Sequence, residues 1–120
     1  VFLPEGGAHA ALSAHPELMV RLLTDSPELP GVQALVVGPG MGKLRGELLK
    51  DLFERYGDTP TVIDADALNI LSEERSLLSR LPKESVLTPH PGEAARLIGV
   101  TTSEIQQDRL RAAEKLAELT

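Results

Sequence analysis

The feature that most constrains the fold is an alternation that occurs three times: a short apolar run, a turn and a stretch that begins with helical spacing. The apolar runs are Ala34–Val37, Pro60–Ile63 and Ser85–Thr88, and the clearest helical patterns are Lys43–Tyr56 and Gly92–Ile98. This order predicts an α/β fold with a mainly parallel sheet, because parallel neighbours need long crossovers that helices supply. We expect three layers, with helices on both faces of the sheet.

The three turns that follow the apolar runs are expected to lie together. They are Gly38–Gly42, Asp64–Asn69 and Thr88–Glu93. The carboxyl ends of parallel strands share one edge of a sheet, and ligands of open α/β sheets bind outside that edge. The sequence therefore predicts one ligand site made of three segments that are far apart in the chain.

The first turn, Gly38–Gly42, reads Gly-Pro-Gly-Met-Gly and opens a helical pattern. Glycines permit a tight turn and a close approach of a ligand to the backbone, and a helix N-terminus favours an anion. The spacing matches neither a dinucleotide fingerprint nor a P-loop, and Leu44 stands where a P-loop has Ser or Thr. A turn that binds no ligand is therefore an open alternative.

The second turn carries two carboxylates, Asp64 and Asp66. At the end of an extended strand they would face the same side, where they could hold a magnesium-bound phosphate or orient water. A structural interpretation fits equally well: Asp66 caps the next helix, and Asp64 accepts bonds from nearby backbone N–H groups.

The third turn is the most specific, because Pro89 and Pro91 stiffen the backbone on both sides of His90. Pro91 suits the first turn of a helix, and Glu93 would be favoured there by the helix dipole. We expect a rigid elbow that presents an imidazole at a strand end. The other histidines, His9 and His15, lie in a weakly patterned region and receive no role.

The ends of the chain have weaker patterns. Val1–Leu3 and Leu18–Val20 are expected as short extended pieces, and Ala8–Ala14 as a helix. Ser103–Thr120 is expected to be one helix, with Ser103 as its cap. Its predicted buried stripe consists of Ile105, Leu110, Ala113, Leu116 and Ala117.

Composition excludes several classes of function. The formal net charge of −6 over 120 residues argues against nucleic acid as a partner, since duplex binding relies on clustered Lys and Arg. The absence of cysteine removes disulfides, thiol nucleophiles and cysteine-based zinc sites. No apolar run is long enough to cross a bilayer, and no serine-hydrolase elbow or His-Glu-x-x-His zinc motif occurs. We expect a soluble cytoplasmic enzyme.

Taken together, Val36–Gly42, Ile63–Asn69 and Leu87–Glu93 resemble the ADP- or ATP-dependent NAD(P)H-hydrate dehydratases, which have a ribokinase-like fold. The resemblance implies that residues 1–120 are part of a single ribokinase-like domain, incomplete at both ends. It also implies that the family's catalytic aspartate, in a Gly-Gly-Thr-Gly-Asp motif, lies beyond Thr120, so the 120 residues alone would be inactive.

The resemblance further implies a metabolite-repair activity, in which ADP or ATP, with magnesium, drives dehydration of the hydrates NADHX and NADPHX back to NADH and NADPH. A homo-oligomer is expected. No catalytic residue and no certain metal ligand is assigned within the chain. The implied substrate contacts are first Gly40, Gly42 and His90 and then Gly38, Gly92 and Glu93, with Asp64, Asp66 and Asn69 as supporting residues. A ribokinase-like kinase for a small alcohol and a non-catalytic assembly piece are the alternatives.

Overall fold

The computed structural model describes the whole chain except residues 1, 4, 18, 20, 23–26 and 43–44. The chain divides into two compact units, Val1–Pro30 and Gly31–Thr120. The larger unit contains all three turns that the sequence singles out.

The smaller unit consists of strand β1 (Phe2–Leu3), helix α1 (Glu5–Ala14) and strand β2 (Arg21–Leu22). The two strands are parallel, with Leu3 opposite Leu22. The helix begins three residues before the predicted Ala8. Two residues of the predicted piece Leu18–Val20 lie outside the described part of the chain, and β2 follows this piece directly.

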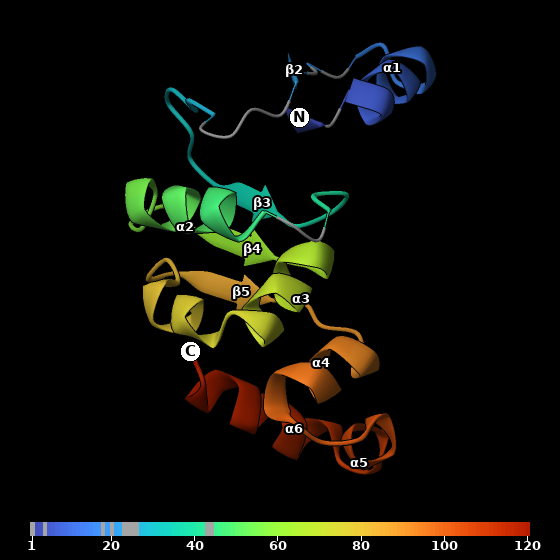
Figure 1. Cartoon of the computed structure of the whole chain (residues 1–120), viewed down its shortest axis with the longest axis vertical. Helices are drawn as coiled ribbons and strands as arrows, with labels where there is room; N and C mark the ends of the chain where they lie inside the picture. The colour runs from blue at the N-terminus through green and yellow to red at the C-terminus, as the bar shows by residue number, and fades with distance from the viewer. Residues whose placement is uncertain (1, 4, 18, 20, 23–26, 43–44) are drawn as a thin grey trace. The chain divides into compact units, whose positions relative to one another are not determined.

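The larger unit is built on a parallel sheet in the order β3 (Leu35–Val37), β4 (Thr61–Ile63) and β5 (Ser85–Leu87), as Figure 1 shows. Val36, Val62 and Val86 lie opposite one another in register. The parallel α/β architecture predicted from the alternation is therefore confirmed.

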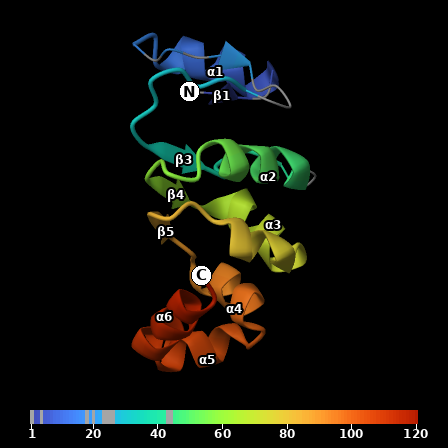
Figure 2. The same cartoon turned by 90° about the vertical axis from the view of Figure 1, so that its left-hand side faces the viewer.

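Helices α2 (Gly46–Arg55) and α3 (Ala65–Glu73) lie on the same side of these strands (Figure 2). A 3-10 helix, η1 (Arg75–Arg80), leads from α3 back toward β5. Both α-helices bury an apolar stripe because their apolar residues recur at helical spacing. The core of this layer comprises Leu48, Leu49, Leu52 and Phe53 of α2, Ala67, Leu68, Ile70 and Leu71 of α3, and Val37, Ile63 and Leu77.

The two faces of the sheet differ in burial. Successive residues of a strand point to opposite faces. Val37 and Ile63 are buried, whereas Val36 and Val86 are 68% and 58% exposed. The strand predicted as buried over Ala34–Val37 is thus buried on one face only, and two of the three expected layers are seen among the described residues of this unit.

After β5 the chain forms helices α4 (Pro91–Ile98), α5 (Thr102–Gln107) and α6 (Arg109–Glu118). Helix α4 ends as predicted, at Gly99, whose φ of +81° is a conformation that glycine adopts readily. The three helices share a small apolar cluster of Ala94, Ala95, Ile105 and Ala112.

The prediction of a single helix over Ser103–Thr120 is wrong, because the helix is interrupted at Asp108. The Asp108 side chain accepts a 3.0 Å hydrogen bond from the backbone N–H of Arg111 and so caps a second helix. Because the two helices are not continuous, the predicted buried residues do not all lie on one face. Ile105 is buried as predicted, but Leu110 is 81% exposed.

The start of this region also differs from the prediction. Thr101, not Ser103, caps α5, and its hydroxyl oxygen accepts a hydrogen bond from the backbone N–H of Glu104. The Glu104 carboxylate accepts in return from the Thr101 backbone N–H at 2.9 Å, which completes a capping box. The helix therefore begins two residues earlier than expected.

Candidate functional site

The carboxyl ends of β3, β4 and β5 lie at one edge of the sheet, which we call the carboxyl rim (Figure 1). Two backbone hydrogen bonds extend the strand pairing beyond the strand ends: Asp64 N–H donates to Val37 O, and Thr88 N–H donates to Ile63 O. The three predicted turns leave the sheet from this rim. Their expected convergence is confirmed.

Gly38 is required by packing against the neighbouring turn. Its φ is +118°, and a Cβ added there would lie 1.7 Å from the carbonyl oxygen of Asp64. Gly40 and Gly42 also have positive φ, but a Cβ on either would meet nothing within 4 Å. The last two glycines therefore face open space, where a ligand can approach the backbone.

The two aspartates bind different backbone groups. Asp64 Oδ1 accepts from Ala65 N–H at 2.8 Å and caps α3, whereas Asp66 Oδ2 accepts from Gly42 N–H at 2.8 Å. Helix α3 begins at Ala65, whose φ is +50°, so Asp64 is extended but Asp66 is already helical. The expectation of two carboxylates on one side of an extended strand is therefore not met. The prediction of Asp66 as the helix cap is also wrong. Asp66 instead joins the acidic turn to the glycine turn.

Asn69 connects α3 to α4. Its Oδ1 accepts hydrogen bonds from Nε and Nη2 of Arg96, at 3.1 and 2.8 Å. Among the described residues, no carboxylate lies within 4 Å of the Arg96 guanidinium. Its side-chain partner is the neutral amide of Asn69. The sequence analysis missed Arg96, because the pair is 27 residues apart and no local pattern marks it.

The elbow at His90 has the predicted form, with Pro91 as the first residue of α4. The Nδ1 atom of His90 accepts from the backbone N–H groups of Gly92 and Glu93, at 3.0 and 3.3 Å. Glu93 Oε2 accepts from the His90 backbone N–H at 2.8 Å, and Glu93 Oε1 lies 3.2 Å from His90 Nε2. His90 and Glu93 thus form a reciprocal capping box.

The two residues of this capping box differ in solvent exposure. Glu93 is 5% exposed, whereas the His90 side chain is 62% exposed. A Cβ at Gly92 would lie 2.8 Å from Cε1 of His90, so the glycine makes room for the imidazole ring. The elbow therefore presents one accessible imidazole above a buried carboxylate.

The remaining histidines do not join this site. The side chain of His9 lies outside the described part of the structure. His15 is exposed in the smaller unit, where its Nδ1 lies 3.2 Å from Glu17 Oε1. The titratable groups with a shifted pKa also lie elsewhere. The hydrogen bond and charge of Lys83 lower the pKa of Asp58, and hydrogen bonds from Thr101 lower that of Glu104.

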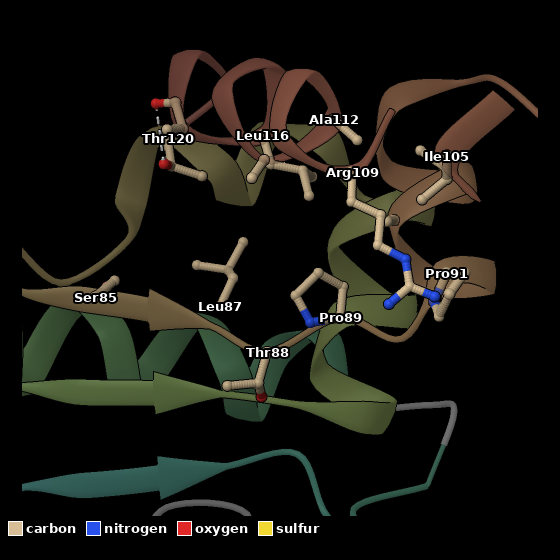
Figure 3. Close-up of a pocket in the computed structure, with 13 residues that line it drawn as sticks. Ser85, Leu87, Thr88, Pro89, Pro91, Ile105, Arg109, Ala112, Leu116 and Thr120 are labelled. Carbon is tan, nitrogen blue, oxygen red and sulfur yellow. Dashed lines mark hydrogen bonds between the residues drawn. The ribbon is translucent and has the colours of Figure 1, made fainter. Parts of the chain in front are cut away.

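A groove of about 450 Å³ runs between β5 and α6 (Figure 3). Its lining is largely apolar, and Arg109 is the charged side chain among the residues that line it. Thr88, Pro89 and Pro91 of the elbow border the groove, but His90 and the glycine turn do not. The groove is therefore separate from the predicted site at the carboxyl rim, although residues of the elbow border both.

Among the described residues, no three His, Asp or Glu side chains gather closely enough to hold a metal ion. None of the described helices combines the length and the apolar character that a membrane span requires.

Comparison with known proteins gives a consistent assignment. The family model of NAD(P)H-hydrate dehydratase matches residues 1–120. The ADP-dependent (S)-NAD(P)H-hydrate dehydratase of Neisseria meningitidis serogroup B is 39% identical over 114 residues, which cover 92% of this chain and 38% of that protein.

Two bifunctional NAD(P)H-hydrate repair enzymes are also similar. The one from Escherichia coli is 41% identical over 111 residues, 89% of this chain and 21% of the enzyme. The one from Moorella thermoacetica is 45% identical over 91 residues, 74% of this chain and 17% of the enzyme. The chain thus spans between 17% and 38% of the length of these three relatives.

Proposed function

This chain belongs to the NAD(P)H-hydrate dehydratase family, and from that premise we propose that the whole protein repairs hydrated NADH and NADPH. A phosphoryl group from ADP or ATP is transferred to the ring hydroxyl of the hydrate. Departure of the phosphate, with loss of a ring proton, then restores the ring double bond. The similarity to a dehydratase named as ADP-dependent supports the use of a nucleotide.

The observation that carries this proposal is the arrangement of the carboxyl rim. The glycine turn is open at Gly40 and Gly42, and the exposed imidazole of His90 leaves the same edge of the sheet. A nicotinamide hydrate is a polar ring that needs such hydrogen-bonding groups around it. We assign substrate contacts to these three residues, with Gly38, Gly92 and Glu93 as further members of the pocket wall.

Asp64, Asp66 and Asn69 have the supporting role in this proposal. Their hydrogen bonds to Ala65, Gly42 and Arg96 fix the positions of the turns before a ligand binds. Phosphoryl transfer depends mainly on such positioning and on stabilisation of charge. The Arg96 guanidinium adds a positive charge beside this edge, which suits a substrate that carries phosphates.

The described residues do not fit a magnesium site by themselves. Within the described ranges, no three acidic or histidine side chains converge, and one oxygen of Asp64 and one of Asp66 already accept a backbone N–H. The chain also contains no Gly-Gly-Thr-Gly-Asp motif for a catalytic base. We therefore assign residues 1–120 to substrate positioning and expect them to be inactive alone.

The test is to incubate the full-length protein with hydrated NADH and either ADP or ATP, and to follow the return of nicotinamide absorbance. Turnover that requires nucleotide supports the proposal. Formation of a stable phosphorylated alcohol without recovery of NADH would favour a ribokinase-like kinase, and no reaction with either nucleotide would favour an assembly role. Light scattering and fractionation test the expected homo-oligomer and cytoplasmic location.

A further inference from the structure

We propose that Glu93 is a positioning residue that holds the His90 imidazole in its Nε2–H tautomer, so that His90 meets a ligand as a hydrogen-bond donor and not as a base. The tautomer follows from the geometry of the elbow. The identity of the ligand rests on the proposed function.

The Nδ1 side of the ring determines where the proton lies. Two backbone N–H groups, those of Gly92 and Glu93, point at Nδ1 from 3.0 and 3.3 Å. A backbone N–H can only donate, so Nδ1 has to accept and carries no proton. A neutral imidazole has one N–H, which must then be on Nε2.

The Nε2 side lies beside a negative charge. Glu93 Oε1 is 3.2 Å from Nε2, so its charge favours a proton on that nitrogen. The other carboxylate oxygen, Oε2, is held at 2.8 Å by the His90 backbone N–H, so the carboxylate cannot rotate away without losing a bond. Because Glu93 is 5% exposed, it reaches a ligand through the imidazole more readily than directly.

The polar group of the ring that remains available to a ligand is therefore a hydrogen-bond donor, the Nε2–H. Nδ1 faces the helix N-terminus, and Cε1 lies above Gly92, while 62% of the side chain stays exposed. The Nε2–H can donate to an acceptor oxygen of a bound molecule. Hydrated NADH offers such oxygens in its carboxamide, its ring hydroxyl and its phosphates.

A second capping box in the same chain shows that capping alone does not require histidine. Thr101 and Glu104 make the same reciprocal contacts at α5 with a hydroxyl group. Small polar residues such as Thr are the preferred caps. The imidazole at the start of α4 supplies something that Thr101 lacks, a ring N–H on a side chain that is 62% exposed.

The direct test is ¹⁵N NMR of histidine ring nitrogens in the full-length protein. His90 is assigned by its loss in His90→Asn. We expect an unprotonated Nδ1 and a protonated Nε2 for His90. His15, whose Nδ1 lies 3.2 Å from the Glu17 carboxylate and has to donate to it, should show the opposite preference, with the proton on Nδ1. A proton on Nδ1 of His90 would overturn the assignment whether or not the protein turns over hydrated NADH.

Variants of the two boxes test the role of Glu93. Glu93→Gln removes the negative charge beside Nε2 but keeps an oxygen that can accept the His90 backbone N–H. The share of the Nε2–H tautomer should therefore fall, and KM for the hydrate should rise about tenfold with a smaller change in kcat. Glu104→Gln is the matched control and should change neither. An unaltered tautomer in Glu93→Gln would refute the positioning role.

Substitutions at His90 separate capping from donation. His90→Asp keeps an acceptor for the cap but has no N–H to donate. We expect its unfolding midpoint to stay within about 2 °C of wild type while kcat/KM falls at least about tenfold. His90→Ala should lose both the cap and the donor. Normal turnover by His90→Asp would exclude the donor role, even if the tautomer is as proposed.

Discussion

The two edges of the larger sheet are closed in different ways. At the amino ends of the strands, backbone groups bond to one another: Thr61 N–H donates to Glu84 O, and Lys83 N–H donates to Gly57 O. Side chains at this edge form an exposed ion pair between Lys83 and Asp58, at 2.7 Å, and the hydroxyl groups of Thr61 and Ser85 donate to nearby backbone carbonyls. Among the described contacts, no side chain at this edge accepts from a backbone N–H.

The carboxyl rim depends on side chains instead. Asp64, Asp66 and His90 each accept from backbone N–H groups of a turn, and Asn69 accepts from Arg96. These bonds fix the turns yet leave part of each polar group accessible. We therefore expect substitutions at the amino edge to affect stability alone, and substitutions at the carboxyl rim to affect the proposed function as well.

The largest effect is expected for Gly38→Ala. The new Cβ would overlap the Asp64 carbonyl oxygen, and alanine at a φ of +118° is strained. We expect the free energy of unfolding to fall by about 3 kcal/mol or more, measured by urea denaturation. Gly31→Ala is the control, because its φ is +68° but its Cβ would meet nothing within 4 Å, so it should cost only about 1 kcal/mol. Equal losses would contradict the packing explanation.

Asp66→Ala should affect function more than stability. It removes the acceptor for Gly42 N–H, so the glycine turn loses its link to α3. We expect a loss of about 1 kcal/mol in unfolding free energy and a roughly tenfold rise in KM for the hydrate in the full-length protein. An unchanged KM would show that the turn keeps its position without this bond.

Thr101→Ala removes a helix cap that belongs to neither edge. The loss of the Thr101 oxygen leaves the Glu104 backbone N–H without its side-chain acceptor. We expect a cost of about 1 kcal/mol in stability with unchanged kcat and KM. Thermal unfolding and steady-state kinetics on one preparation check both parts, and a large kinetic defect would weaken the distinction between the rim and the rest of the fold.

The smallest effect is expected for Asp58→Asn at the amino edge. Lys83 lowers the pKa of Asp58 through a hydrogen bond and its charge, so the unfolded chain takes up the proton more readily than the folded one. The contribution of the carboxylate is therefore present at pH values above the ordinary pKa of Asp and is lost as the pH falls through the lowered value. Unfolding midpoints of wild type and variant should differ slightly at pH 7 and converge in acid. A difference that grows in acid would reverse the expected sign.

Much of the larger unit follows from local patterns. Apolar runs and helical spacing are set by neighbouring residues, so β3, β4, β5, α2 and α4 could be predicted to within a few residues. The convergence of the turns could be predicted as well, because parallel pairing places successive strand ends at one edge. The elbow at His90 was predictable because two prolines restrict the backbone around it.

The contacts between the turns could not be predicted. The bond from Gly42 to Asp66 spans 24 residues and depends on the backbone conformation of Ala65, a residue type with no preference for positive φ. The pairing of Asn69 with Arg96 depends on how two helices pack. The helix break at Asp108 was missed because a single capping side chain outweighed an otherwise continuous apolar pattern.

The register of the sheet has a consequence for the order of folding. Leu35 pairs with Thr61 and Thr61 with Ser85, so the paired residues are 26 and 24 positions apart in the sequence. Closing such loops costs chain entropy before any strand contact forms, which makes parallel pairing slow compared with helix formation. During refolding, the helices of this unit should therefore gain structure before the three turns come together, and the carboxyl rim should form among the last parts of this unit.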